Sequence, residues 1–458
     1  MSAMLDCLKS VNYVHLVVLS GNLLALTGDL SIAWPSPILA KLNSTDNPLA
    51  DYPTKDELSW VASISGFGSM VGILPFSFLP DLIGRKSCLL MIPIPHMISF
   101  GLAAFGKSIY LLYVARFFSG ISIAACYLVL PMYIAEISEN SNRGLMLVSY
   151  AIFSNFGSLL CYATGPYMSM LWFNMFILIF PVTFFISFLF IAPESPYYYA
   201  RKKDYIKASK SIERLRSGKH YHNAELELKT ICDELDNAQT GDILRTITRK
   251  YAIKGSLIAI MLTTFQQLSG YAVFMPYTQT IFLEVGSDID SAVCSIMVGS
   301  ISFFSSFVCP FVIDKKGRRF VLITSLLGII TSEIVFGIYY YLSDQNYNMN
   351  SFTWVPLACL LSYMLFFTFG LGPLPLTVSS EVLPVNIKFL VTTVASFLGS
   401  LSSTVCSKYY YVLNDSLGYF GTIWLFAGFC TVLLVFIVVI LPETKGRSFT
   451  EILQELDR

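Results

Sequence analysis

The chain has 458 residues, of which 55% are hydrophobic and only 13% are charged. A soluble domain carries about 25% charged residues, so this composition excludes an ordinary soluble protein and indicates a polytopic membrane protein. The formal net charge is zero and says nothing about partners.

Membrane spans need roughly 20 apolar residues each, and by that length the chain contains about twelve of them. We expect these spans to be helices, because backbone polar groups inside a bilayer must be satisfied within the segment. The first apolar stretch runs from Tyr13 past Leu26 without a small-residue cleavage site, so it is interpreted as a span and not as a signal peptide. In chain order the spans start near Tyr13, Leu58, Cys88, Tyr110, Leu145, Trp172, Ala252, Ala292, Phe320, Trp354, Leu390 and Phe420.

Three short signatures occur in the same order in each half of the chain, at nearly constant offsets. The pairs are Asp81-x-x-Gly84-Arg85-Lys86 with Asp314-x-x-Gly317-Arg318-Arg319, Pro131 to Glu136 with Pro375 to Glu381, and Pro193-Glu194-Ser195 with Pro442-Glu443-Thr444. This repetition predicts two homologous six-helix halves related by an axis along the membrane normal. We expect the first half at residues 1–196, a cytoplasmic helical linker at 197–251, the second half at 252–445 and a tail at 446–458.

Basic residues concentrate in the loops of one side, including Arg85, Arg143, Lys388 and the segment 201–254. The positive-inside bias makes this side cytoplasmic and places both termini there. Two sequons fall in loops of the other side, at Asn43 and Asn414, where glycosylation is possible. Chance is the favoured explanation for the second, which has Asp415 in its middle position.

The ten cysteines lie mostly inside spans and lack metal-ligand spacing, so they are interpreted as small apolar side chains. No nucleotide loop, metal cluster or nucleophile signature is present. We therefore expect no enzyme activity, no catalytic residue, no metal and no cofactor.

A further set of motifs is distributed over nearly the whole chain. These motifs are Asp81/Gly84/Arg85, Arg116/Gly120, Pro131-x-Tyr133-x-x-Glu136, Arg143-Gly144, Pro193-Glu194-Ser195-Pro196, Gln266-Gln267-Leu268-Ser269-Gly270, Asp314/Gly317/Arg318/Arg319, Gly370-x-Gly372-Pro373-x-Pro375, Glu381 and Pro442 to Ser448. Taken together, they resemble the motifs of the sugar porter family of the major facilitator superfamily. Pro35-Ser36-Pro37 and Asn155-Phe-Gly157 are most similar to its facilitated trehalose transporter branch.

The resemblance implies an all-α membrane protein of twelve transmembrane helices, acting by alternating access in the plasma membrane. It implies facilitated diffusion of a trehalose-like disaccharide or a hexose. A proton-coupled symporter and a non-transporting sugar sensor are the alternatives; the chain stops at Arg458, soon after the final motif, which favours a transporter. The expected partners are the sugar and the lipid bilayer, with no nucleic acid, and the protein is expected to be a monomer.

The resemblance also implies the substrate site, although several amides typical of the family are missing. Ala272 and Ser302 stand where asparagines are usual in the family, and Gly399-Ser400 stands where Asn-Trp is usual. We therefore expect a larger ligand held by aromatic faces, with Trp34 as a further platform. For each of these aromatic side chains, packing against lipid or against the protein core is the alternative role. The expected substrate-binding residues are Gln266, Gln267, Tyr271, Tyr277, Ser302, Phe367 and Thr368.

Charged residues at the helix ends are expected to form gating ion pairs that close the inner gate in the outward-open state. Simple anchoring of basic residues is the alternative. As exposed pairs they would contribute only ~0–1 kcal/mol each. The expected gating residues are Asp81, Arg85, Glu136, Arg143, Glu194, Asp314, Arg318, Glu381, Lys388 and Glu443.

Two charged residues of the first half are candidates for proton coupling. Asp29 lies within the first span, where a charge costs roughly 2.5–3.5 kcal/mol unless it is paired. Arg116 stands at the start of the fourth span, where an interfacial position is the simpler interpretation. We expect passive transport, with Asp29 as a structural acid held by hydrogen bonds.

Overall fold

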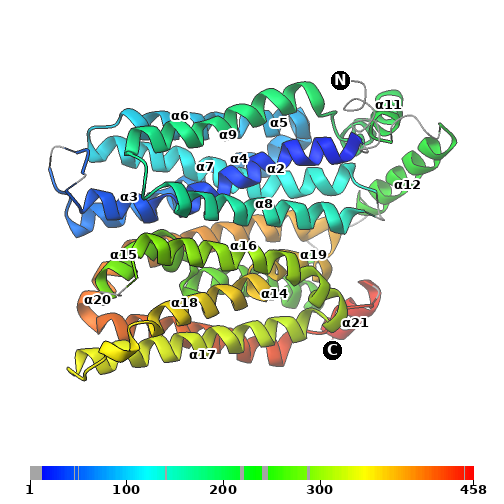
Figure 1. Cartoon of the computed structure of the whole chain (residues 1–458). Coiled ribbons are helices and arrows are strands. Elements are labelled where there is room, and N and C mark those ends of the chain that lie inside the picture. Colours follow the sequence, from blue (N-terminus) through cyan, green and yellow to red (C-terminus); the bar gives the residue numbers. More distant parts are fainter. Residues whose placement is uncertain are drawn as a thin grey trace, which may run out of the picture.

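The computed structural model describes residues 13–45, 47–49, 51–139, 142–216, 221–239, 246–285, 289–447 and 449–457. The side chain of Asp314, one of the expected gating residues, lies outside this description. The described residues form helices, turns and loops without a strand. They build two helical bundles that lie side by side, one from each half of the chain (Figure 1).

The first bundle contains six spans, two of which are divided by prolines. Proline fixes φ and lacks an N–H, so it fits the first turn of a helix, where that N–H would have no intrahelical acceptor. Pro35 starts α3 directly after α2, and Pro93 starts α6 directly after α5. The helices are α2 (Tyr13–Ala33), α3 (Pro35–Leu42), α4 (Lys55–Ile83), α5 (Arg85–Met91), α6 (Pro93–Phe105), α7 (Ile109–Ile137), α8 (Arg143–Thr164) and α9 (Met170–Ile191).

A helical linker follows, and its own small apolar cluster holds it together. Ala200, Ile212, Ala224 and Ile231 are buried against one another. The linker helices are α10 (Pro196–Arg201), α11 (Tyr205–Leu215) and α12 (Tyr221–Gln239).

The second bundle repeats the arrangement with two broken spans. Its elements are α14 (Lys250–Gln266), η1 (Gln267–Tyr271), α15 (Ala272–Val285), α16 (Ser291–Lys316), α17 (Arg318–Asp344), η2 (Asn350–Phe352), α18 (Val355–Phe366), η3 (Phe367–Leu371), α19 (Leu374–Val382), α20 (Val385–Ile440) and the short terminal α21 (Phe449–Asp457).

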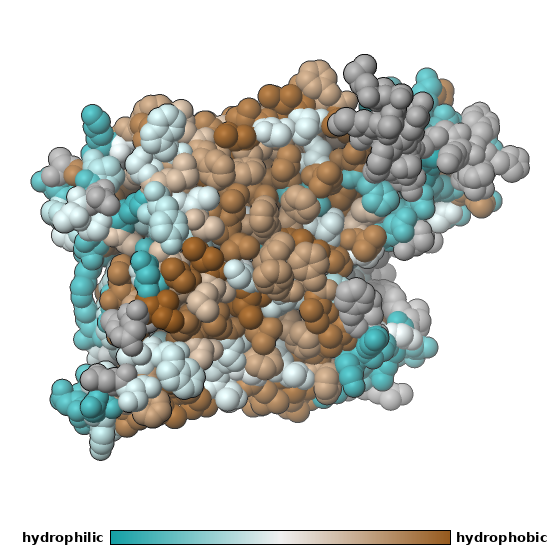
Figure 2. Space-filling view, viewed as in Figure 1, coloured by the Kyte–Doolittle hydropathy of each residue, from teal (hydrophilic) through white to brown (hydrophobic). Residues whose placement is uncertain are grey.

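The described residues contain eleven segments long and apolar enough to cross a membrane, and the last of them, Asn386–Ile440, has 55 residues. A span needs only about 20 residues, so this segment is long enough for two. Gly418 divides it, since its φ of +72° is not helical. Ten single spans and one double span make twelve, which confirms the predicted fold. Figure 2 shows apolar side chains around the middle of the molecule and polar ones at both ends.

The two ends of the molecule differ. The start of α2, the linker helices α11 and α12, and α21 lie together at one end, which we call the linker end (Figure 1). At the opposite end α3 packs against α15 of the second bundle. There the Ser36 Oγ accepts a hydrogen bond from the Gln279 N–H at 3.0 Å. Closer to the middle, the Tyr162 hydroxyl donates to the Met275 carbonyl at 2.9 Å.

Candidate functional site

Two spans of the second bundle break their helical pattern where the expected substrate residues lie. In η1 the break is at Gly270, whose φ of +88° favours glycine because it has no Cβ. A Cβ at this position would lie 2.7 Å from the Phe274 ring. The other break is η3, a second π-helical turn; such turns are frequent at functional sites.

The two predicted glutamines turn out to have different surroundings. The Gln266 Nε2 donates to the carbonyls of Leu371 and Gly372, at 2.9 and 2.8 Å. It therefore joins one helix break to the other and satisfies carbonyls at the end of η3. Gln267 is partly exposed, and among the described residues its amide has no hydrogen-bond partner. Its donors and acceptor are therefore not used by another described residue.

The aromatic candidates divide into two groups. Tyr271 and Phe367 stack across the breaks with ring centroids 4.3 Å apart and planes 6° from parallel, and Thr368 follows on η3. Tyr277 is fully buried, and its hydroxyl donates to the Ser407 carbonyl at 2.9 Å. Ser302 donates within its own helix to the Val298 carbonyl at 3.1 Å. These last two residues are satisfied by the protein itself in this structure.

Trp34, the further platform considered, is buried in the first bundle. Its Nε1 donates to the Asn174 Oδ1 at 2.9 Å, and its ring lies 5.5 Å from the Arg116 guanidinium carbon. An indole with this hydrogen bond and this cation on its ring has a packing role that needs no ligand.

Asp29 is buried in α2 between hydroxyl groups. The Tyr127 hydroxyl donates to its carboxylate, and Ser154 also hydrogen-bonds to it. Tyr271 of the second bundle lies close enough to interact with Asp29 electrostatically. The sequence did not indicate Tyr127 or Ser154, because tyrosine and serine inside spans carry no distinctive pattern.

Arg116 does not have the interfacial position that was the simpler interpretation, and its role in proton coupling stays a prediction. The residue is only 4% exposed, because its side chain turns inward from α7 toward α2 and α4. Its guanidinium donates to the Ser31 and Val61 carbonyls at 2.7 and 3.2 Å and to the Ser65 hydroxyl at 2.8 Å. These neutral acceptors replace water around the buried charge. Asp29 is not among the described hydrogen-bond partners of Arg116.

The glutamates of the two Pro-Glu-(Ser/Thr) signatures act as helix caps. Glu194 accepts hydrogen bonds from the backbone N–H groups of Arg85 and Lys86 at 2.8 and 3.1 Å. The first N–H groups of a helix have no intrahelical acceptor, and the positive end of the helix dipole favours a carboxylate. Burial raises the pKa of Glu194, although these backbone hydrogen bonds oppose the rise. Gly84 allows this approach, since a Cβ there would collide with the Glu194 carboxylate.

The second half repeats this cap. Glu443 accepts from the backbone N–H groups of Arg318 and Arg319 at 2.9 and 3.2 Å. Gly317 has a φ of +94°, and a Cβ on it would lie 2.6 Å from a Glu443 oxygen. Glycine therefore stands at the same place in both motifs for the same reason: the capping carboxylate occupies the space that a Cβ would fill.

Ion pairs join the other predicted residues within each half. Arg85, only 1% exposed, binds Glu136 through Nε at 3.0 Å and Asp81 at 2.9 Å. Asp81 also pairs with Arg201 of the linker at 2.5 Å. In the second half, Arg318 binds Glu381 at 3.0 Å.

Arg143 and Lys388 do not join these pairs. The Lys388 amine donates to the Ser380 carbonyl at 3.3 Å. The buried Nε of Arg143 has no hydrogen-bond partner in the described part of the chain. The gating role assigned to both residues stays a prediction.

The two sequons have different exposure. Asn43 is exposed after α3, whereas Asn414 is only 8% exposed and its amide is buried in α20. A glycan on Asn414 would have to displace the packing around it. The structure therefore contradicts Asn414 as a glycosylation site, and Asn43 remains a prediction.

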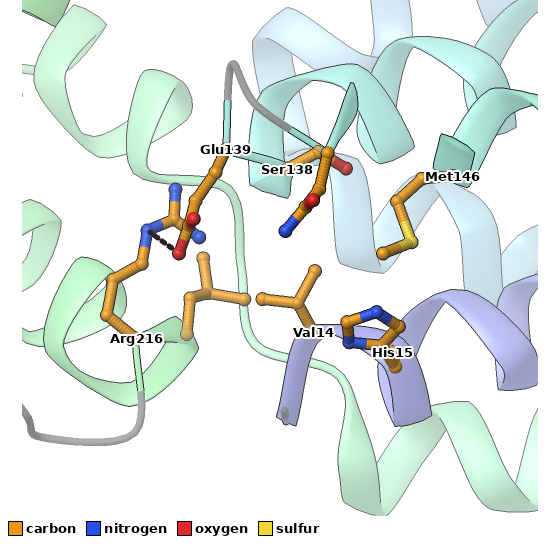
Figure 3. Close-up of a pocket in the computed structure, with 8 residues that line it drawn as sticks. Val14, His15, Ser138, Glu139, Met146 and Arg216 are labelled. Atoms are coloured by element: carbon orange, nitrogen blue, oxygen red, sulfur yellow. Dashed lines mark ion pairs between the residues drawn. The ribbon is translucent and has the colours of Figure 1, made fainter. Parts of the chain in front are cut away.

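A cavity of about 30 Å³ lies at the linker end, between α2, α8 and α11 (Figure 3). Its volume holds a water molecule or two, far less than a sugar. Arg216 borders it and binds Glu139 at 3.6 Å and Glu227 at 2.6 Å. This polar corner fastens the linker to the first bundle and is no substrate site.

Comparisons with known proteins agree with this architecture. A family profile described as Sugar (and other) transporter matches residues 33–456. The facilitated trehalose transporter Tret1 of Bombyx mori is 30% identical over 433 residues, covering 94% of this chain and 85% of the relative. The Tret1-2 homolog of Drosophila sechellia is 31% identical over 446 residues, covering 95% and 89%. The inward-open xylose transporter XylE from E. coli has the same fold, with a TM-score of 0.77 over 97% of this chain and 99% of that one, at 21% identity.

Proposed function

The chain belongs to the sugar (and other) transporter family, and on this premise we propose that it carries a sugar across a membrane by alternating access. The proposed substrate is a trehalose-like disaccharide or a hexose. Two of its relatives are named facilitated trehalose transporters. The linker end, with the basic loops, faces the cytoplasm of a plasma-membrane protein, and Asn43 lies at the outer end.

The observation that supports this proposal most is the pair of helix breaks in the second bundle. Broken helices near the bilayer midplane are the usual binding elements of secondary transporters. Here they present the unpaired amide of Gln267 beside the stacked rings of Tyr271 and Phe367. An amide offers donors and an acceptor, as sugar hydroxyls require, and aromatic rings cover the apolar face of a sugar.

Uptake into proteoliposomes tests the proposal. Labelled trehalose and labelled glucose are expected to enter until the inner and outer concentrations are equal, with at least one of them saturating. Empty vesicles provide the control. Binding of a sugar without uptake would support the sensor alternative, and neither binding nor uptake of any mono- or disaccharide would contradict the proposal.

We further propose that transport is passive. Asp29 is held by Tyr127 and Ser154, and Arg116 by carbonyls and serine hydroxyls, so each candidate for proton coupling is satisfied separately. An imposed pH gradient is therefore expected to leave the final sugar level unchanged, in the parent protein and in Asp29→Asn alike. Accumulation above equilibrium that a protonophore abolishes, and that Asp29→Asn lacks, would show a proton symporter instead.

A further inference from the structure

Lys408 reaches from α20 of the second bundle to the first turns of α4 in the first. Its amine binds the Asp56 carboxylate at 2.5 Å and donates to the Ser59 hydroxyl at 2.9 Å. It also lies 4.3 Å from the centre of the Trp60 ring. We call these four residues the opposite-end clamp. They join residues of the two bundles about 350 positions apart in the chain.

The clamp differs from an ordinary surface ion pair. The side chain of Lys408 is only 15% exposed, although that of Asp56 is 72% exposed. A neighbouring pair between the same helices, Lys55 with Asp415, is 66% and 65% exposed at 3.3 Å. Exposed pairs of this second kind contribute almost nothing to stability. Lys408 instead combines a carboxylate, a hydroxyl and an aromatic face in partial shelter from water.

The position of Lys408 makes this combination necessary. Asp56 lies in the first turn of α4, whose N-terminus is capped by Thr54 and Glu57. A positive charge is disfavoured near a helix N-terminus by the helix dipole. Lys408 therefore depends on Asp56 and on the Trp60 ring to remain there.

The clamp is linked to the helix that closes the opposite end. Ser407, the preceding residue, donates through its hydroxyl to the Ala272 carbonyl at 2.6 Å, and its backbone carbonyl accepts from the Tyr277 hydroxyl at 2.9 Å. Both partners belong to α15, which packs on α3 through Ser36 and Gln279. A displacement of α15 away from α3 would therefore also displace the part of α20 that carries Lys408, because these two hydrogen bonds join it to α15.

We propose that the opposite-end clamp is a conformational lock that holds the two bundles closed at this end and must release before substrate can enter there. The proposal rests on the alternating-access transport proposed above. It assigns the lock at this end to a contact between the bundles, whereas the ion pairs of Arg85 and Arg318 at the linker end lie within single halves.

The test measures opening directly and needs no substrate. Ser36 is fully buried in the closed seam, so a Ser36→Cys variant should react slowly with a soluble maleimide in purified protein. Adding Lys408→Met is expected to raise the labelling rate about fivefold, since the loss of one partly sheltered ion pair shifts a two-state equilibrium by about that factor. Lys55→Met, in the exposed pair, is the matched control and should leave the rate unchanged. The parent without Ser36→Cys gives the background from native cysteines.

Two further variants keep the test decisive. Asp56→Asn changes a mostly exposed side chain and should give a smaller increase, because Lys408 keeps Ser59 and Trp60. The exchange Asp56→Lys with Lys408→Asp should bring the rate back toward that of the parent. Unchanged labelling in both Lys408→Met and Asp56→Asn would overturn the proposal, as would an equal increase in Lys55→Met. A protein that shows the labelling changes but transports no sugar would contradict the proposed function and leave the clamp standing.

Discussion

Replacing Arg85 with methionine is expected to lower the free energy of unfolding by about 3–5 kcal/mol, because one partner of a buried ion pair is removed. Arg85 is 1% exposed and Glu136 is 14% exposed. The substitution leaves Glu136 with the Ser195 hydroxyl alone and leaves the Pro80 carbonyl without its donor. Thermal unfolding of purified protein in detergent measures the loss as a lower Tm.

Arg318→Met is the matched control for this experiment, since it removes the equivalent residue of the second half. Arg318 and Glu381 are 21% and 25% exposed, so water screens and solvates that pair more. We expect a clearly smaller fall in Tm and near-normal surface expression, with slower transport. Equal losses for the two variants, or no loss for Arg85→Met, would show that burial of the pair does not set its contribution.

Gln267→Ala is expected to weaken sugar binding by about 1–3 kcal/mol, roughly a factor of 5 to 150 in Kd, if a buried hydroxyl loses its partner. The Tm should stay close to that of the parent, because the structure shows no intramolecular hydrogen bond of this amide among the described residues. Binding is measured by isothermal titration or by inhibition of labelled uptake.

Gln266→Ala provides the contrast for this second prediction. Its amide holds the carbonyls of Leu371 and Gly372, so its loss should lower both the Tm and transport. A Gln267→Ala protein that binds and carries every tested sugar as well as the parent would place the substrate elsewhere. Comparing the two variants therefore distinguishes an amide that contacts the ligand from an amide that stabilises the structure.

The ion pairs also change the expected energetics of the linker end. The sequence suggested exposed pairs of ~0–1 kcal/mol that open and close with transport. The structure instead buries Arg85 and uses Glu194 and Glu443 as helix caps. These helix caps and ion pairs stabilise the helix ends within each half. A gating role of the same residues would therefore be additional to this structural role.

The sequence by itself determined the number of spans, the division into two halves and the position of each motif. The physical reason is that bilayer thickness sets the length of an apolar helix, and that water and lipid leave no other place for charged loops. Such features depend on residues near one another in the chain.

The tertiary structure decided which side chains meet. Whether Glu194 would bind a side chain or cap α5, whether Arg116 would reach the interface or turn inward, and which of Gln266 and Gln267 would remain unpaired all depend on the rotation and tilt of helices far apart in sequence. Asn414 shows the same limit, since its sequon is local but its burial is set by α20 packing among the other spans. A rotation of one residue, about 100° around a helix axis, exchanges a lipid-facing position for a buried one, and only the packed bundle fixes it.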